Sequence, residues 1–260
     1  MTNERATKSI RQDWDDRARK NAFFYIASWR SDWDRDSFFR SGEEDYSRLV
    51  ESALNRAGFE SEGKTVVEVG CGAGRMTRCF AGRFGQVMAV DISSEMQERA
   101  KQFLPEFKNI HWILADGATL NGIESSSSDF VFSYLVLQHL PSPDLAQALL
   151  REFSRVLRPG GAFLFQYNGA PKRSMNLYGR LVWSFVNALW SVGWKKAGRG
   201  VARVMKLDPE MVGKSWHGVS LTTGEVRASL EHAGASALQF WGDGTTMAWC
   251  WGTKSSEDRA

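Results

Sequence analysis

Cysteine is scarce in this chain of 260 residues, which has only Cys71, Cys79 and Cys250, at wide spacing. Three such cysteines make neither a disulfide framework nor a metal site, and no other metal-ligating cluster is visible in the sequence. Residues 1–20 are charged throughout and lack the apolar core of a signal peptide. We therefore expect a cytoplasmic protein without a bound metal.

Acidic residues are absent between Phe153 and Leu207, a window that holds ten basic residues. This window alone does not predict a nucleic-acid partner, because the net charge of the chain is only +3 and its pI is about 8.8. No separate RNA-binding module or basic-aromatic repeat accompanies it. We therefore expect no specific nucleic acid as a partner.

An apolar run long enough to cross a bilayer is also lacking in that window. Its uncharged part, residues 181–194, has 14 residues, against the roughly 20 that a spanning helix needs. We expect a helix over 176–194 with one narrow polar stripe and a wide apolar face that includes Trp183 and Trp190. We consider three roles for this face: a lid over an apolar pocket, a peripheral contact with anionic lipid, or a dimer face. The sequence is compatible with both a monomer and a homodimer.

The stretch 65–91, by contrast, has the pattern of a β-α-β unit. An apolar strand leads into Gly70, Gly72 and Gly74, a segment with helical spacing follows, and a second apolar strand ends at Asp91. Glycines let the backbone turn tightly and let a ligand approach without meeting a Cβ atom. Free N–H groups at the start of the following helix face such a ligand. A carboxylate at the end of the second strand accepts hydrogen bonds from ribose hydroxyls, so the pattern predicts a nucleoside site.

Glu68, two residues before the first glycine, indicates which nucleoside. A carboxylate there repels a pyrophosphate but attracts an ammonium group. The stretch from Glu68 to Gly74 resembles motif I of the class I S-adenosylmethionine-dependent methyltransferases, and Asp91 matches the acid with which that family binds the ribose. The resemblance implies that the glycines line the methionine part of the cofactor and that Arg75 meets its carboxylate.

The resemblance extends over residues 64–168 through five ordered motifs. A third strand at 110–115 ends in Asp116-Gly117, which matches the family's acid for the adenine amino group; stabilisation of a turn is the alternative for Asp116. A fourth strand at 129–133 is followed by a segment similar to the family's motif IV. The Pro-Gly-Gly turn at 159–161 precedes a fifth strand at 162–167.

Methyl transfer is an in-line displacement at carbon, so the protein mainly positions the acceptor and excludes water. A hydroxyl or thiol acceptor also benefits from a base, for which we consider His139 and His217. Tyr25, Tyr134 and Trp216 are candidates to face the sulfonium, because an aromatic ring stabilises a cation.

These considerations assign three sets of site residues. The predicted cofactor site comprises Glu68, Gly70, Cys71, Gly72, Gly74, Arg75, Asp91, Ile92, Asp116, Gly117, Ser133 and Tyr134. The predicted catalytic residues are His139, His217 and Tyr134. The predicted substrate contacts are Tyr25, Trp183, Trp190, Trp216 and His217.

We predict an α/β fold, a doubly wound and mostly parallel seven-stranded sheet of the Rossmann-like methyltransferase type. Its expected divisions are an N-terminal helical cover at 1–60, a cofactor-binding core at 61–170, a helical lid or substrate insertion after the fifth strand at 171–220, and a C-terminal helix and hairpin at 221–260.

Several local boundaries follow from the pattern. The first residues are expected to become helical near Trp14, and the aromatic-rich stretch 21–40 to form short helices over the cleft or a packing skirt at the domain edge. A helix at 43–57 ends at Gly58, the helix after the glycines ends at Gly85, and the last two strands lie at 237–241 and 245–251.

The predicted activity is methyl transfer from S-adenosyl-L-methionine to a small molecule, with an anionic and partly apolar acceptor as one option. The alternatives are an RNA methyltransferase that uses the acid-free window to contact phosphates, and a non-catalytic protein that binds S-adenosylmethionine or a membrane surface. The sequence does not reveal the acceptor or the atom that is methylated.

Overall fold

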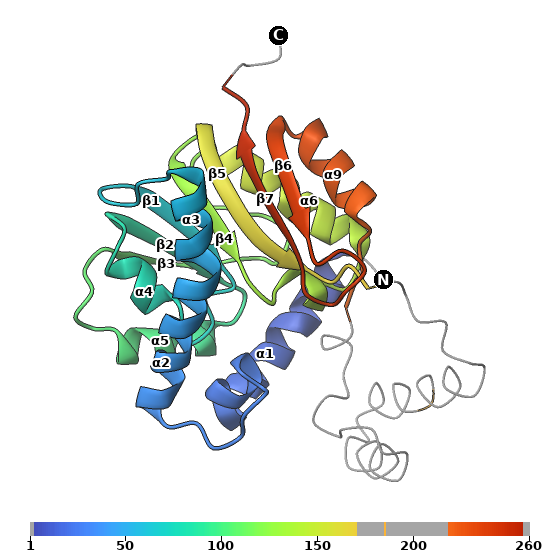
Figure 1. Ribbon diagram of the computed structural model, residues 1–260. Coiled ribbons are helices and arrows are strands. Elements are labelled where there is room, and N and C mark those ends of the chain that lie inside the picture. Colours follow the sequence, from blue (N-terminus) through green and yellow to red (C-terminus); the bar gives the residue numbers. More distant parts are fainter. Residues whose placement is uncertain (1–2, 171–184, 186–217, 257–260) are drawn as a thin grey trace.

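A computed structural model describes residues 3–170, 185 and 218–256. Its centre is a seven-stranded sheet of order β3-β2-β1-β4-β5-β7-β6 (Figure 1). The strands are β1 (Thr65–Val69), β2 (Gln86–Asp91), β3 (Ile110–Leu114), β4 (Ser128–Ser133), β5 (Leu157–Tyr167), β6 (Ala235–Trp241) and β7 (Ala248–Lys254). Among the strands described, β7 alone runs opposite to all the others. The predicted doubly wound, mostly parallel sheet is confirmed.

The strand order reverses beside β1. The chain first builds β2 and β3 on one side of β1, then crosses to place β4 on the other side. In open sheets of this kind the carboxyl ends of the strands at such a reversal flank a crevice. The apolar, β-branched sequence of β1 suits this central place, because the strand is covered on both faces.

Alternation along the strands gives the sheet two cores, one on each face. Val66 and Phe130 point to the core that is covered by α2 (Arg35–Asp45), α3 (Ser52–Ala57), α4 (Thr77–Ala81) and α5 (Ser94–Phe103). Val67 and Val131 point to the other core, which is covered by α6 (Pro143–Val156) and α9 (Thr223–His232). In Figure 1, α6 and α9 lie together on one face.

The N-terminal helices begin earlier than the sequence predicts. α1 (Asn3–Ile26) is helical well before Trp14 and breaks only at Asn21, where φ is −167°. It lies at the edge of the sheet where the parallel strands end (Figure 1). α2 begins at Arg35 because the Asp34 side chain caps it, and a π-helical segment, Tyr46–Glu51, joins it to α3. α3 ends at Gly58, as predicted, with φ of 62°.

Several predicted boundaries are wrong. β5 begins at Leu157 instead of Ala162, so the predicted turn at 159–161 lies within the strand, and β6 begins at Ala235 instead of Ala237. α4 ends at Gly82 instead of Gly85. β7 begins at Ala248 instead of Thr245, because Thr245 closes a turn onto Gly242, with 2.7 Å between its Oγ1 and the glycine carbonyl oxygen, and its own carbonyl accepts from Gly169. The predicted helix at 176–194 lies outside the described residues. Among the residues described, no helix combines the length and apolar character that crossing a bilayer requires.

Candidate active site

A cavity of ≈390 Å³ lies at the carboxyl ends of β1, β2 and β4, where the strand order reverses. Besides these strand ends and the turn after β1, α1 contributes Trp14 and Tyr25 to its lining, and the loop between β6 and β7 contributes Met247. Open α/β sheets bind their ligands in such crevices. We therefore take this cavity as the candidate active site.

The turn after β1 adopts a conformation that requires glycine. Gly70 and Gly72 have φ values of 82° and 54°, in the left-handed region. A Cβ atom on Gly70 would lie 2.1 Å from Cγ2 of Val136, and one on Gly72 would lie 2.8 Å from Cδ1 of Ile26. The N–H of Gly70 donates to the Val90 carbonyl at 2.7 Å. The turn is thus packed between β2, α1 and the segment after β4.

Most of the predicted cofactor residues meet in this cavity. Its lining includes Glu68, Gly70, Cys71, Gly72, Arg75, Asp91, Ile92, Gly117 and Tyr134. Gly74 and Ser133 are not among the lining residues. Gly74 packs against Leu104, and the buried Ser133 hydroxyl donates to the Val69 carbonyl at 3.2 Å, which ties β4 to β1.

Glu68 is a buried carboxylic acid at the cavity wall. Only 4% of it is exposed, and its Oε2 makes no hydrogen bond with any residue that the structure describes. Burial raises the pKa of the Glu68 carboxyl to about 8, against the opposing effects of the nearby Thr77 hydroxyl and of the Arg75 charge. A buried carboxyl oxygen without a partner is costly, and an ammonium group brought into the cavity would supply that partner.

Asp91 lies at the end of β2 and holds the glycine turn in place. Its Oδ2 accepts from the N–H of Gly72 at 2.8 Å, and its Oδ1 accepts from the N–H of Ser93 at 2.8 Å. Burial raises the pKa of Asp91 to about 6, while these backbone hydrogen bonds act in the opposite direction. Each carboxylate oxygen has a second lone pair, so the side chain has the capacity to accept ribose hydroxyls as well.

Arg75 is engaged by the N-terminal cover. Its Nη1 lies 2.8 Å from Oδ2 of Asp45 and donates to the Ser41 carbonyl at 3.0 Å. The guanidinium carbon is 5.3 Å from the ring centroid of Trp29 and 5.9 Å from that of Tyr134. These contacts fasten the glycine turn to α2. The predicted contact of Arg75 with the cofactor carboxylate stays a prediction.

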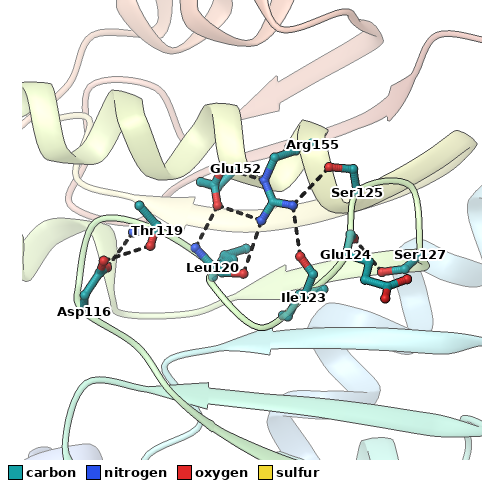
Figure 2. Close-up of polar contacts among 9 residues, drawn as sticks. All are labelled: Asp116, Thr119, Leu120, Ile123, Glu124, Ser125, Ser127, Glu152 and Arg155. Atoms are coloured by element: carbon teal, nitrogen blue, oxygen red, sulfur yellow. Dashed lines mark hydrogen bonds and ion pairs between the residues drawn. The ribbon is translucent and has the colours of Figure 1, made fainter.

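Asp116 folds back on its own turn (Figure 2). Its Oδ1 accepts from the N–H groups of Ala118 and Thr119, at 2.8 and 2.7 Å, and its Oδ2 accepts from the Thr119 hydroxyl at 2.8 Å. The side chain is exposed, and it is Gly117 rather than Asp116 that lines the cavity. The geometry matches the turn-stabilising interpretation, and the adenine contact stays a prediction.

Two residues of α6 anchor the loop between β3 and β4 (Figure 2). Glu152 accepts from the N–H of Leu120 at 2.8 Å, and Arg155 donates to the carbonyls of Ile123 and Leu120 at 2.9 and 3.2 Å. Arg155 also pairs with Glu152 at 2.7 Å. Since Thr119 and Leu120 line the cavity, this anchor sets the position of its wall.

The other predicted site residues divide into two groups. His139 and Tyr25 are buried and line the cavity, where the Trp14 ring meets the His139 ring edge-on at 5.3 Å. Trp183, Trp190, Trp216 and His217 lie outside the described residues.

The sequence analysis does not identify several of the residues that line the cavity. Trp14 and Tyr25 lie on either side of the break in α1 at Asn21, so helical periodicity does not connect them, although both line the cavity. Gln138 and Met247 carry no local signal, since tertiary packing alone brings them to the cavity.

This site belongs to an α/β fold with a glycine turn after β1 and a carboxylate at the end of β2, the arrangement in which open α/β sheets bind nucleosides. Residues 67–165 match the family model described as a methyltransferase domain. Among curated proteins, the chain is 33% identical over 136 residues to the trans-aconitate 2-methyltransferase of Azoarcus sp. (strain BH72), covering 52% of this chain and 50% of that protein. It is 34% identical over 151 residues to an uncharacterized chloroplastic methyltransferase of Arabidopsis thaliana, covering 55% and 40%. The chain thus spans about half, or less, of the length of these relatives.

Solved structures of other proteins have the same fold as this chain. The structure of DhpI with S-adenosylhomocysteine superposes with a TM-score of 0.57 at 19% identity, covering 97% of this chain and 98% of that one. Phosphoethanolamine N-methyltransferase 1 of Haemonchus contortus gives a TM-score of 0.54 at 22% identity, covering 68% and 35%. Residues 67–165 and the fold around them therefore belong to the class I S-adenosylmethionine-dependent methyltransferases. The cofactor of this family is S-adenosyl-L-methionine.

Proposed function

We propose that the protein transfers the methyl group of S-adenosyl-L-methionine to a small-molecule acceptor. The observation that carries this proposal is the pair of carboxylates in one cavity, Glu68 beside the glycine turn and Asp91 at the end of β2. Their spacing along the β-α-β unit suits a ligand with an ammonium group at one end and a ribose further along.

The roles of the two carboxylates follow from their surroundings. Glu68 holds the ammonium group, which gives its unpartnered Oε2 a charged hydrogen-bond donor. Asp91 accepts the ribose hydroxyls while it keeps the glycine turn in place. When bound, the cofactor supplies a methyl group that is already activated on a sulfonium. The protein then has to orient the acceptor and exclude water.

The acceptor that we propose is small, anionic and partly apolar. The guanidinium carbon of Arg17, on α1, lies 4.8 Å from the ring centroid of the cavity-lining Trp14 and 5.7 Å from that of Tyr25. Lys20 Nζ donates to the Tyr25 hydroxyl at 3.2 Å. These two cations lie beside aromatic residues that line an apolar cavity and are available to attract an anion there, with Asp13 near Arg17 acting in the opposite direction.

Two relatives carry names that agree with an anionic acceptor. The relative from Azoarcus is named for trans-aconitate, and a relative from Arabidopsis thaliana, 30% identical over 121 residues, is named for phosphoethanolamine. A carboxylate or a phosphate monoester is therefore the class to test first. His139, His217 and Tyr134 remain our candidates for contact with the reacting groups, and among them His139 and Tyr134 line the described cavity.

Calorimetry tests the cofactor assignment. S-adenosylmethionine and S-adenosylhomocysteine are expected to bind in the micromolar range, and NAD is expected not to bind. Asp91→Asn should weaken binding by about 1–3 kcal/mol, roughly 5- to 150-fold, because the amide accepts at one oxygen only and sets its NH2 group against a backbone N–H. The matched control is Asp144→Asn, an exposed aspartate on α6. Comparable affinity for NAD, or a neutral Asp91→Asn, contradicts the assignment.

Turnover tests the reaction itself. Release of S-adenosylhomocysteine should be measured against a panel of small carboxylates, phosphate monoesters, phenols, thiols and amines. Activity confined to the anionic members supports the proposed acceptor class. Activity only on amines that carry no anionic group contradicts that class, and cofactor binding without turnover on any acceptor favours the non-catalytic alternative.

A further inference from the structure

A chain of side-chain hydrogen bonds links His139 to the rim of the cavity. Gln166 on β5 is fully buried, and its Nε2 donates to the Thr246 carbonyl at 2.7 Å and to Oε1 of Gln138 at 3.2 Å. Its Oε1 accepts from the N–H of Leu135 at 3.1 Å. Gln138 Nε2 lies 3.3 Å from Nε2 of His139.

Two backbone groups fix the orientation of the first amide. Side-chain amides can usually be turned over without changing their shape. Turning Gln166 over would set its oxygen against the Thr246 carbonyl and its nitrogen against the Leu135 N–H, so two acceptors and two donors would face each other. Gln166 therefore donates an N–H to Gln138, and the side-chain oxygen of Gln138 must accept it.

The orientation of Gln138 in turn fixes the proton on the histidine. With its oxygen turned to Gln166, Gln138 presents N–H to His139. An amide nitrogen donates and does not accept, so Nε2 of His139 must be the acceptor. In a neutral imidazole only one nitrogen accepts, and the other then carries the proton. The proton of His139 is consequently on Nδ1.

We propose that Gln166 and Gln138 are positioning residues that hold His139 as its neutral Nδ1–H tautomer, in which Nε2 is occupied by Gln138 and does not serve as a base. Acting as a base through Nε2 would place an N–H of the ring against an N–H of Gln138 and would require that contact to break. This inference takes its setting, the cavity and its reaction, from the proposed function.

The backbone beside the network supports a positioning role. Leu135 has φ of 59°, a left-handed conformation that is unusual for a non-glycine residue, and its N–H is the group that Gln166 accepts from. Strain of this kind persists where surrounding contacts enforce it, and it gathers at functional sites. The edge-on Trp14 ring also packs against the imidazole from α1.

The tautomer of His139 bears on whether the methyl acceptor must be ionised before it reacts. Methyl transfer to a carboxylate oxygen forms an O–C bond, breaks an S–C bond and releases no proton, so no base is needed. A neutral phenol or thiol must lose a proton, which a histidine with Nε2 occupied does not accept. With His139 held in this tautomer, an acceptor that is already ionised, such as a carboxylate, needs no other base, whereas a phenol or thiol would need one from elsewhere in the site.

Nitrogen NMR of the ¹⁵N-labelled full chain tests the tautomer directly, above the pH at which the histidines are protonated. His139, assigned by its loss in His139→Gln, is expected mainly as the Nδ1–H form, by about two- to tenfold, the bias that one hydrogen bond gives. His111 is the internal control, because its Nε2 lies 2.6 Å from Oε1 of Gln86 and should carry the proton. A His139 that is Nε2–H, or an even mixture, overturns the proposal.

Variants then test the network. Gln138→Leu should remove the Nδ1–H bias of His139, and Gln138→Glu should reverse it, since a carboxylate only accepts. Gln86→Leu is the matched control and should alter His111 alone. An unchanged His139 tautomer in both Gln138 variants overturns the role of the glutamine. The wild-type spectrum decides the tautomer even if a variant folds poorly, and it needs no cofactor, so a failure of methyl transfer is a separate result.

Discussion

Glu68 holds a proton at neutral pH in the unliganded protein, because burial keeps its pKa at about 8. An ammonium group beside it favours the ionised form instead. Cofactor binding must therefore lower the pKa of this carboxyl and release its proton. By linkage, affinity for the cofactor rises with pH up to about 8, as long as the ammonium group keeps its proton.

For the Glu68 residue we therefore predict the release of about one proton when S-adenosylhomocysteine binds at pH 7. Calorimetry in buffers that differ in ionisation enthalpy measures that number. Glu68→Gln should abolish the release and weaken binding, whereas Asp144→Asn should change neither. A binding heat that does not depend on the buffer means that Glu68 is not the ammonium site.

At the scale of the element, α2 is pressed against the glycine turn. A Cβ atom on the buried Gly42 would lie 2.1 Å from the carbonyl oxygen of Arg75. Gly42→Ala should therefore destabilise the protein by about 1–3 kcal/mol through overpacking, and it should weaken cofactor binding by shifting the turn. Thermal unfolding and calorimetry measure the two effects.

The control for this substitution is Gly224→Ala on α9, where a Cβ atom would meet nothing nearer than Oγ1 of Thr222 at 4.0 Å. It should be neutral or stabilise by up to about 1 kcal/mol, since alanine favours a helix. Equal effects of the two substitutions would show that α2 is not in close contact with the turn.

The anchor on α6 supports a second prediction for an element. Arg155→Leu removes the donors to the Leu120 and Ile123 carbonyls (Figure 2). It should cost about 1–3 kcal/mol of stability, because buried carbonyls lose their partners. It should also weaken cofactor binding, since Thr119 and Leu120 line the cavity. The exposed Arg151→Leu on the same helix is the control, and a cofactor affinity equal in both variants contradicts the role of the anchor.

At the scale of the whole molecule, the two site carboxyls make the stability of the fold decrease as pH rises. Carboxyls with a lowered pKa have the opposite effect. The pKa values of Glu68 and Asp91, about 8 and about 6, lie above their reference values of 4.5 and 3.8. The native state therefore binds more protons than the unfolded state between these values. The stability that this supplies is present below about pH 4 and is lost as pH rises through 6 and 8.

Other carboxyls act in the opposite direction. Hydrogen bonds from the Cys79 thiol and from Arg155 lower the pKa values of Glu43 and Glu152, respectively, and the stability that they supply is lost below about pH 4.5. We expect the melting temperature of the unliganded protein to peak in the mildly acidic range and to fall between about pH 6 and 8. Glu68→Gln should flatten that fall, and a melting temperature that rises over this range contradicts the prediction.

The sheet and the glycine turn are predictable from sequence because their signals are local. The strand pattern, the alternate glycines and Asp91 all occur within short windows, and the order of motifs fixes the topology. Arg75 shows where this reasoning ends: its position suggests a cofactor contact, but its partner in the structure is Asp45, thirty residues upstream. The Arg155 anchor is likewise invisible to periodicity, because it depends on which surfaces meet after folding.

The place of β7 has a consequence for synthesis on the ribosome. This last strand of the sequence lies between β5 and β6, so β5 emerges long before its antiparallel partner exists. Until then the nascent chain presents an unpaired apolar edge around Phe163–Phe165, which is prone to pair with other chains. A chain cut short before Ala248 never closes that edge, and it should gather in inclusion bodies although the whole cofactor unit has been made.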